Sequence, residues 1–430
     1  MRSSDIIKPW FRRALPWALF DWANSAFITT VTAGFLPLFN KSFWSVGAPE
    51  TVSTFRLSVA HSVSGIIVAI LAPVLGAFAD HCGARKRFLL FFTLLGVTMT
   101  VGLFFAKEGQ WAFALVLFAV ASIGFSGSNI FYDSLILNVA DKDKLDAVSA
   151  LGYGMGYIGG GLLFTLNIFA VTRPEVFGLS SASEAIRWSF LSVGVWWAVF
   201  TVPLMVYVPE ARPVEPFAGV RKTVRAGFVQ LRETFHEVRQ HKTAFTFLIA
   251  YWLYIDGVDT VIRMAVDYGS SLNLPGDSLI KALLLTQFIG FPAAIVFGRI
   301  GEKLGAKTGI LICLVVYGGV CVFGSFMETV THFYALAVTV GLVQGGVQSL
   351  SRSLFARLIP ADKAGEFFGF YNMMGKFAAI IGPILMSFVG LVTGSPRLGI
   401  LSLILLFGIG GILLWRVKVP KEAESEAALP

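Results

Sequence analysis

Charged residues are scarce in this sequence. Asp, Glu, Lys and Arg make up 14% of its 430 residues, against about 25% in an ordinary soluble domain. Hydrophobic residues make up 56%, and the mean hydropathy is +0.74. A soluble chain of this composition could not cover its own surface. This excludes a typical cytosolic enzyme, a disordered protein and a nucleic-acid-binding protein, despite the net charge of +8, and leaves an integral membrane protein.

Cysteine and histidine are also rare. The three cysteines, Cys82, Cys313 and Cys321, form no disulfide framework. The five histidines form no cluster with metal-ligand spacing, and no G-x-x-x-x-G-K-[ST] phosphate-binding motif occurs. We therefore expect no metal, no cofactor, no ATP-driven pumping and no enzymatic activity.

Long apolar runs dominate the rest of the chain, and alternating strands of the β-barrel type are not seen. Because a helical span uses about 20 apolar residues, the runs predict an all-α integral membrane protein with twelve transmembrane helices. The predicted spans are 15–38, 56–79, 88–106, 111–138, 147–170, 187–208, 244–266, 279–300, 308–327, 331–357, 367–391 and 398–416.

The basic residues predict the orientation. Most of the 34 Lys and Arg residues fall on one side of the predicted spans, including the run 85–87. By the positive-inside rule both termini are cytoplasmic. The basic start has no small-residue cleavage site, so we expect no signal peptide. We expect a multi-pass protein of the bacterial inner membrane.

One long polar segment divides the predicted spans into six and six. The predicted domains are an N-terminal six-helix bundle (1–208), a cytoplasmic linker (209–243), a C-terminal six-helix bundle (244–416) and a cytoplasmic tail (417–430). Apolar residues recur every three or four positions from Phe217 to Val238, with arginines between them. This pattern predicts a basic amphipathic helix on the lipid surface, either as a structural tie or as a regulatory site.

Two motifs recur in both halves, which indicates an internal repeat. The first combines glycine, an acid, glycine and a base at the same spacing in each half. The second places Asp133-Ser-Leu and Arg352-Ser-Leu at corresponding positions. The first motif is the loop signature of the major facilitator superfamily, which the chain resembles, and its members are Gly76, Asp80, Gly83 and Arg85, then Gly298, Glu302, Gly305 and Lys307.

The residue types of the loop signature have a physical reason. Glycine lets two helix ends approach closely, and the acid can bind the positive N-terminus of a helix in the other half. Such a clasp would hold the cytoplasmic side shut. The alternative is that the basic residues of the signature only enforce topology.

Ionisable residues within the predicted spans are costly and therefore functional candidates. Most lie in the first, fourth, seventh and tenth spans, which line the central cavity in the superfamily that the chain resembles. Asp133 and Arg352 have opposite charge at repeat-related positions, so they could pair. We predict a cavity for substrate or protons that includes Asp21, Asn24, Asp256, Asp259, Arg263, Gln344, Gln348 and Lys376, and an inner gate of Asp133, Arg352 and Arg357.

Each of these assignments has a structural alternative. Asp259 and Arg263 are four residues apart and can form a neutralising ion pair on one helix. Asn24, Gln344 and Gln348 can each make helix–helix hydrogen bonds instead of ligand contacts. Asp256 lies near the predicted midplane, where transporters hold their substrates, and this favours a cavity role.

Four longer stretches sharpen the resemblance. They are Phe20–Phe27, Gly152–Gly161, Tyr254–Thr260 and Gly341–Arg357, the last continuing through Glu366–Asn372. These stretches resemble the "unknown major facilitator" family, whose fungal members are autophagy-related vacuolar amino-acid effluxers. Many members have an amide where Asp133 and Asp259 stand, so the extra acids could change the substrate or the proton coupling.

The residues and the resemblance together predict a secondary transporter for a small polar metabolite, with amino acids as the leading guess. A buried carboxyl has a raised pKa and can exchange a proton near neutrality, so we expect proton coupling. The expected partners are a small-molecule substrate and the lipid bilayer, without nucleic acid, and the chain is expected to be monomeric. Two alternatives stay open: an exporter or flippase of an amphipathic or cell-wall-derived molecule, and a non-transporting membrane receptor or scaffold.

Overall fold

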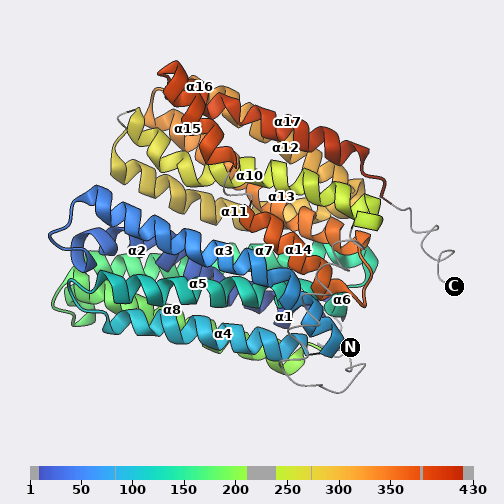
Figure 1. Cartoon of the computed structure of the whole chain (residues 1–430), viewed down its shortest axis with the longest axis horizontal. Coiled ribbons are helices and arrows are strands. Elements are labelled where there is room, and N and C mark those ends of the chain that lie inside the picture. The colour runs from blue at the N-terminus through green and yellow to red at the C-terminus, as the bar shows by residue number, and fades with distance from the viewer. Residues whose placement is uncertain (1–8, 83, 211–238, 273, 378–380, 420–430) are drawn as a thin grey trace, which may run out of the picture.

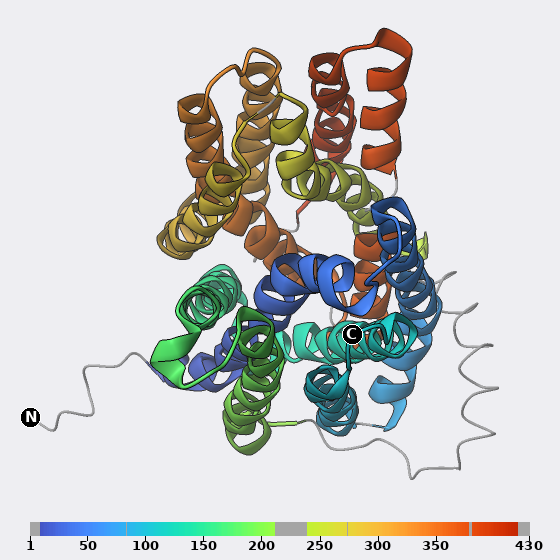
Figure 2. The ribbon, with the colours of Figure 1, turned by 90° about the vertical axis from the view of Figure 1, so that its left-hand side faces the viewer.

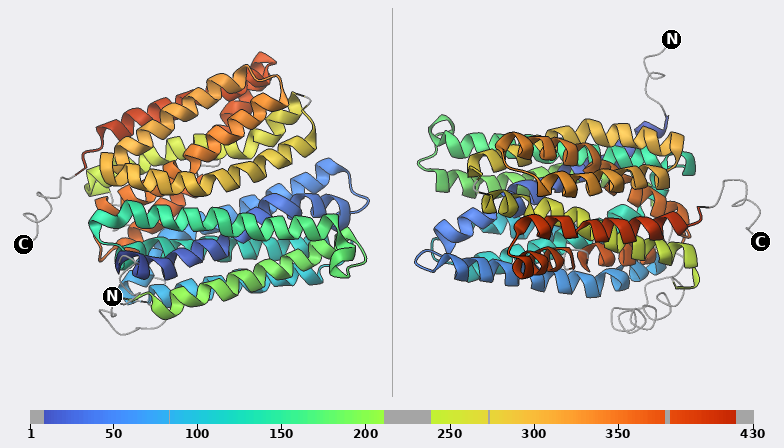
Figure 3. Two further views of the ribbon diagram at one scale, coloured as in Figure 1. Left: turned by 180° about the vertical axis from the view of Figure 1, so that it is seen from behind. Right: turned by 90° about the horizontal axis from the view of Figure 1, so that it is seen from above.

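The structure is a computed structural model that describes residues 9–82, 84–210, 239–272, 274–377 and 381–419. In these ranges the regular structure is entirely helical (Figure 1). The long helices run roughly along one axis, which is also visible from behind and from above (Figure 3). The start of α1 and the end of α17 lie at the same end of the molecule, which we call the terminal end.

The first half of the chain, coloured blue to green in Figure 1, forms one bundle. Its long helices are joined by short helices and turns. The elements are α1 (Pro9–Ala26), η2 (Phe27–Phe35), α2 (Leu36–Phe39), η3 (Asn40–Trp44), α3 (Glu50–Cys82), α4 (Arg85–Gly102), η4 (Leu103–Phe105), α5 (Trp111–Ser134), α6 (Ile136–Val139), η5 (Lys142–Lys144), α7 (Leu145–Thr172), η6 (Pro174–Phe177) and α8 (Ala182–Tyr207).

The second half, coloured yellow to red, forms the other bundle. Its elements are α10 (Lys242–Ser271), α11 (Gly276–Leu304), α12 (Ala306–Ser325), α13 (Val330–Leu358), α14 (Ala364–Phe377), α15 (Ile381–Thr393), α16 (Pro396–Ser402) and α17 (Ile404–Arg416). The predicted amphipathic helix from Phe217 to Val238 lies outside the described residues.

Nine helices in the described part of the chain are long and apolar enough to cross a membrane. Two shorter apolar helices, Val59–Ala72 and Ile381–Thr393, accompany them. The prediction of an all-helical multi-pass membrane protein is therefore confirmed. The number of twelve spans stays a prediction.

The helical run that contains the first predicted span, 15–38, is longer than that span. The helical run extends from Pro9 to Trp44 and widens into π-helical turns at Phe27–Phe35 and Asn40–Trp44. Within it the Thr29 hydroxyl donates to the carbonyl of Ser25, and such back-bonding of threonine disturbs regular α-helical turns. A hydropathy pattern does not register this change of helix type.

The two bundles meet most extensively along two helix pairs. α3 packs along α14, and α7 packs along α11. Viewed end-on, the second half lies above the first (Figure 2). One buried hydrophobic cluster contains residues of both halves, including Trp17, Tyr132 and Tyr254. A second buried cluster, which includes Phe118 and Trp197, draws all its members from the first half.

Candidate functional site

Glycines set how closely the two bundles approach. A Cβ atom on Gly76 of α3 would lie 2.0 Å from the carbonyl oxygen of Gly365 of α14. A Cβ atom on Gly298 of α11 would lie 2.6 Å from the Cβ of Ala150 on α7. Both distances are far inside van der Waals contact. Both loop-signature glycines therefore lie where helices of the two halves approach closely.

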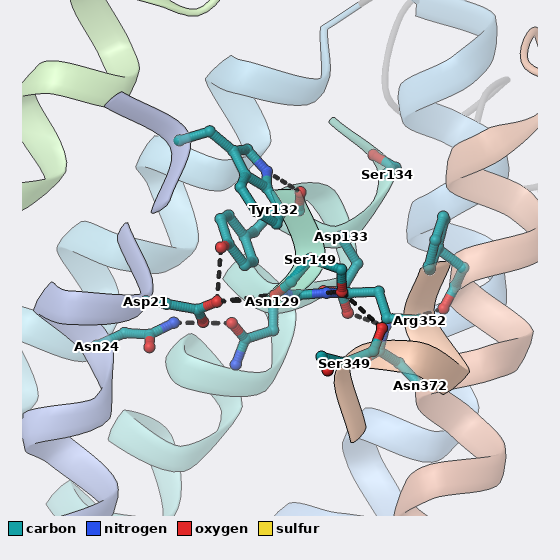
Figure 4. A network of polar contacts seen from close by, with 12 residues as sticks. Asp21, Asn24, Asn129, Tyr132, Asp133, Ser134, Ser149, Ser349, Arg352 and Asn372 are labelled. Atoms are coloured by element: carbon teal, nitrogen blue, oxygen red, sulfur yellow. Dashed lines mark hydrogen bonds and ion pairs between the residues drawn. The ribbon is translucent and has the colours of Figure 1, made fainter. Parts of the chain in front are cut away.

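A buried polar cluster joins the two halves (Figure 4), close to the C-terminal ends of α5 and α13. At its centre is Arg352 of α13, which is 1% exposed. Its Nη1 atom lies 3.3 Å from Asp21 Oδ2 and 3.2 Å from Asp133 Oδ1. Its Nε and Nη2 groups donate to the hydroxyl and the carbonyl oxygen of Ser149, both at 2.9 Å. The predicted pairing of Asp133 with Arg352 is therefore present, and Asp21 joins it.

Aromatic rings surround the same guanidinium group. Its Cζ atom lies 4.8 Å from the ring centre of Trp17, 5.4 Å from that of Tyr132 and 4.2 Å from that of Tyr153. A cation over an aromatic face is attracted by the quadrupole of the ring. Gly152 of α7 leaves the room for this group, since a Cβ atom there would lie 2.8 Å from Arg352 Nη2.

Further hydrogen bonds fix the two carboxylates. The hydroxyl of Tyr132 donates to Asp21 Oδ2 at 2.6 Å. The side-chain amide of Asn372 on α14 donates to Asp133 Oδ2 at 3.0 Å. The cluster thus holds two acids and one base, which gives it a formal charge of −1 when both acids are ionised. One proton taken up by either acid would make it neutral.

A second ion pair between the halves lies closer to the terminal end. Arg357 of α13 binds Asp146 of α7 through two parallel hydrogen bonds of 2.8 and 2.9 Å. The Asp146 side chain is 1% exposed and also accepts a hydrogen bond from Ser353. Lys144 pairs with Glu302 at 3.1 Å, and these side chains are 33% and 29% exposed.

We predict that the two pairs contribute very unequally to stability. Asp146→Asn leaves Arg357 opposite a neutral group at a buried site, so we expect a loss of about 3 kcal/mol. Glu302→Gln removes the same charge from a hydrated pair and should cost about 1 kcal/mol or less. Thermal unfolding of the two detergent-purified variants tests this. Equal midpoints for both variants would contradict the structural importance of the Asp146 pair.

The charged residues of the loop signature make different contacts in the two repeats. The Arg85 guanidinium reaches the backbone carbonyls of Ala361 and Asp362 in the other half, at 3.4 and 3.5 Å. Glu302 binds the side chain of Lys144, which is the N-cap residue of α7 in the other half. Gly83 and the side chain of Asp80 lie outside the described part of the chain.

Two residues of the signature region, Gly305 and Lys307, have structural roles within their own half. Gly305 has a φ of +82° at the turn between α11 and α12, a conformation that glycine adopts readily. The Lys307 ammonium donates to the carbonyls of Trp415 and Val417 at the end of α17, at 2.6 and 2.8 Å. Lys86 binds the carbonyl of Val208 after α8 in the same way. Lys307 therefore corresponds in its contacts to Lys86, although the motif aligned it with Arg85.

Asp256 of α10 is fully buried. Its carboxylate accepts hydrogen bonds from the backbone amides of Ile381 and Gly382 at the start of α15, both at 3.0 Å. The carboxylate thus satisfies two backbone amides of α15. In this conformation Asp256 ties α10 to α15. The structure does not place it beside Asp21 or Arg352.

The other predicted cavity residues are spread along the helices. Asp259 lies 3.8 Å from Arg263, whose side chain is 60% exposed. Asn24 donates to Asn129 within the first half at 2.8 Å. Gln348 accepts from the Tyr157 hydroxyl across the two halves at 3.2 Å. Gln344 is half-buried in α13. Lys376 belongs to α14, but its side chain lies outside the described residues.

Sequence reasoning missed several residues of the polar cluster and of the ion pair beside it. Asp146 follows a run of charged residues and is indistinguishable from a solvated loop acid in the sequence. Ser149 and Tyr153 belong to the glycine-rich start of α7, whose spacing indicated close packing only. The stacking of the Trp17 and Tyr132 rings, with centres 4.4 Å apart, joins residues far apart in the chain and leaves no local signal.

Comparison with known proteins gives consistent matches. The family described as "Vacuole effluxer Atg22 like" matches residues 45–146 and 137–427. The chain is 38% identical over 425 residues to the uncharacterized MFS-type transporter YxiO of Bacillus subtilis, covering 98% of both chains. It is 25% identical over 450 residues to autophagy-related protein 22 of Coccidioides immitis, covering 85% of this chain and 73% of that protein.

The fold also matches solved structures. The human organic anion transporter MFSD10 superposes with a TM-score of 0.72 at 15% sequence identity, over 95% of this chain and 100% of that one. At this identity the likeness concerns the fold alone. It agrees with the two bundles described above, so the chain has the major facilitator fold.

Proposed function

Since the chain belongs to the family of Atg22-like vacuole effluxers, we propose that this membrane transporter moves a small polar metabolite by alternating access coupled to proton movement. Amino acids are the leading substrate class that the sequence resemblance implies, and the matching family is described as vacuole effluxers. The proposal includes twelve spans. The nine long apolar helices, with α3, the α14–α15 pair and the run from Pro9 to Trp44, would account for them.

The observation that carries this proposal is the polar cluster around Arg352. The two halves contact each other through ion pairs and through close approach of helices at glycines. Such contacts can separate and form again, which alternating access requires. The described inter-half ion pairs join α13 to α1, α5 and α7, and the end of α11 to the segment before α7. All of them lie toward the terminal end. We therefore assign Asp133, Arg352 and Arg357 to an inner gate.

The orientation and the coupling ion are part of the same proposal. The positive-inside rule places the terminal end in the cytoplasm of a bacterial cell, with the protein in the inner membrane. Two carboxylates share one guanidinium in the cluster, so a proton can bind there without creating an unpaired buried cation. Intramembrane carboxylates act as proton relays in transporters.

We predict that purified protein in proteoliposomes exchanges labelled amino acids and accumulates them against a gradient only when a pH difference is imposed. Asp133→Asn should reduce accumulation to the level of empty vesicles while exchange continues, because the amide cannot carry a proton. Glu328→Gln is the matched control, since Glu328 is 70% exposed and should not affect transport. Transport that ignores the pH gradient would overturn the coupling. If the vesicles exchange none of the amino acids, the substrate class is wrong.

A further inference from the structure

The two halves of the chain contribute different parts of the site around Arg352. Arg352 belongs to the second half, yet its guanidinium is bound by groups of the first half. Nε donates to Ser149 Oγ, Nη1 to Asp21 and Asp133, and Nη2 to Asp21 and the Ser149 carbonyl. These are five hydrogen bonds, and a guanidinium has five N–H donors. The first half is therefore complementary to a complete guanidinium group.

The side chains that surround the Arg352 guanidinium, which we call the guanidinium pocket, also favour an organic cation. Three aromatic rings of the first half, from Trp17, Tyr132 and Tyr153, lie within 5.4 Å of the guanidinium carbon. Gly152 leaves the space that the group fills. Carboxylates with aromatic faces are the combination that recognises guanidinium and ammonium groups. A small metal ion would leave the aromatic faces without a partner.

The pocket loses its occupant when the halves separate at the terminal end. This step rests on the proposed alternating-access function. Arg352 then moves away with α13, while Asp21, Asp133 and the rings stay together on α1, α5 and α7. Two carboxylates left in a buried site without a cation are strongly unfavourable. A cation from solution can relieve this cost by taking the same place.

We propose that the first half contains a binding site for the guanidinium or primary ammonium group of the transported molecule, and that Arg352 occupies this site when the terminal end is closed. The substrate and Arg352 thus exclude each other. Binding of the cationic group keeps the terminal end open until the group leaves, and its departure lets Arg352 return. The site assigns a cationic group to the substrate class, which the family relationship alone does not.

The pocket can be tested without transport, by filling it chemically. In Arg352→Ala the pocket should be empty, and guanidinium chloride at low millimolar concentration should raise the thermal unfolding midpoint by about 3 °C or more. Sodium chloride at equal ionic strength should not, and wild-type protein should show no such rise. Adding Gly152→Ala to Arg352→Ala should abolish the effect, because the new methyl group fills the space.

Gly161→Ala in the same background is the matched control. Gly161 lies on the same helix, and a Cβ atom there meets nothing closer than 3.7 Å, so the guanidinium effect should persist. Equal midpoint shifts in wild type and Arg352→Ala would overturn the proposal. So would a shift that survives Gly152→Ala. Neither result depends on whether the protein transports amino acids, so the failure of this proposal is distinguishable from failure of the proposed function.

A second measurement uses a protein with Arg352 intact, in case Arg352→Ala does not fold. Spin labels at the exposed positions Asp143 and Lys303 report the separation of the halves at the terminal end, with the three native cysteines replaced by alanine. Agmatine, which carries a guanidinium and a primary amine, should lengthen the distance. L-citrulline, which has a neutral ureido group, should lengthen it less than L-arginine does. An unchanged distance with agmatine and L-arginine would overturn the proposal.

Discussion

Arg352→Gln is expected to destabilise the protein by about 3–5 kcal/mol, the cost of removing one partner from a buried ion pair. Arg352 is 1% exposed and pairs with Asp21 and Asp133 at 3.3 and 3.2 Å. Glutamine is shorter and neutral, so both carboxylates would stay buried without a cation. Since the cost falls on the closed arrangement of the terminal end, we also expect the halves to separate there. Thermal unfolding in detergent measures the first effect, and distance measurements between the halves measure the second.

Arg352→Gln could destabilise the protein through lost charge or through lost packing, and additional substitutions of the two acids distinguish these causes. The triple variant Asp21→Asn, Asp133→Asn, Arg352→Gln has no buried charge in the cluster, so it should recover most of the stability that Arg352→Gln loses. Arg299→Gln, at an exposed position on α11, removes the same charge and should leave the midpoint close to wild type. If the triple variant is no more stable than Arg352→Gln, the charges of the cluster are not what stabilises it.

The sequence could identify this cluster in part, because charge is so rare inside apolar helices. Asp21, Asp133 and Arg352 were each predictable from their cost in the membrane. The internal repeat placed Asp133 and Arg352 at equivalent positions, which made their pairing predictable too. Asp21 as a third partner was not predictable, since it depends on the rotation and tilt of α1 against α5, and hydropathy carries neither.

Asp256 shows a different limit of sequence reasoning. The sequence predicts a position near the midplane of its span, and the structure finds the side chain fully buried. Its partners are the backbone amides of Ile381 and Gly382 in α15. The sequence predicts one continuous span over 367–391. In a continuous helix the backbone amides bond within the helix, so the prediction includes no amide partner for Asp256.

Gly76→Ala is expected to prevent closure at the terminal end, although it adds a single methyl group. The new Cβ atom would lie 2.0 Å from the carbonyl oxygen of Gly365. The obstacle is backbone, which cannot rotate away as a side chain can, so α3 and α14 must move apart. Overpacking of this kind typically costs about 1–3 kcal/mol, and it falls on the closed state alone. We expect the two halves to fold and the inter-half distance at the terminal end to increase, with loss of transport.

Gly65→Ala provides the control on the same helix, because no atom lies within 4 Å of a Cβ built there. It should transport like wild type. Gly298→Ala tests the repeat-related contact, where the added Cβ meets Ala150 at 2.6 Å, and should act in the same direction as Gly76→Ala. Normal transport in Gly76→Ala would mean that the halves need not approach this closely. If Gly76→Ala and Gly298→Ala both lose transport while Gly65→Ala transports like wild type, the terminal end needs a small residue at both loop-signature glycines in order to close. This requirement would be independent of the neighbouring charges.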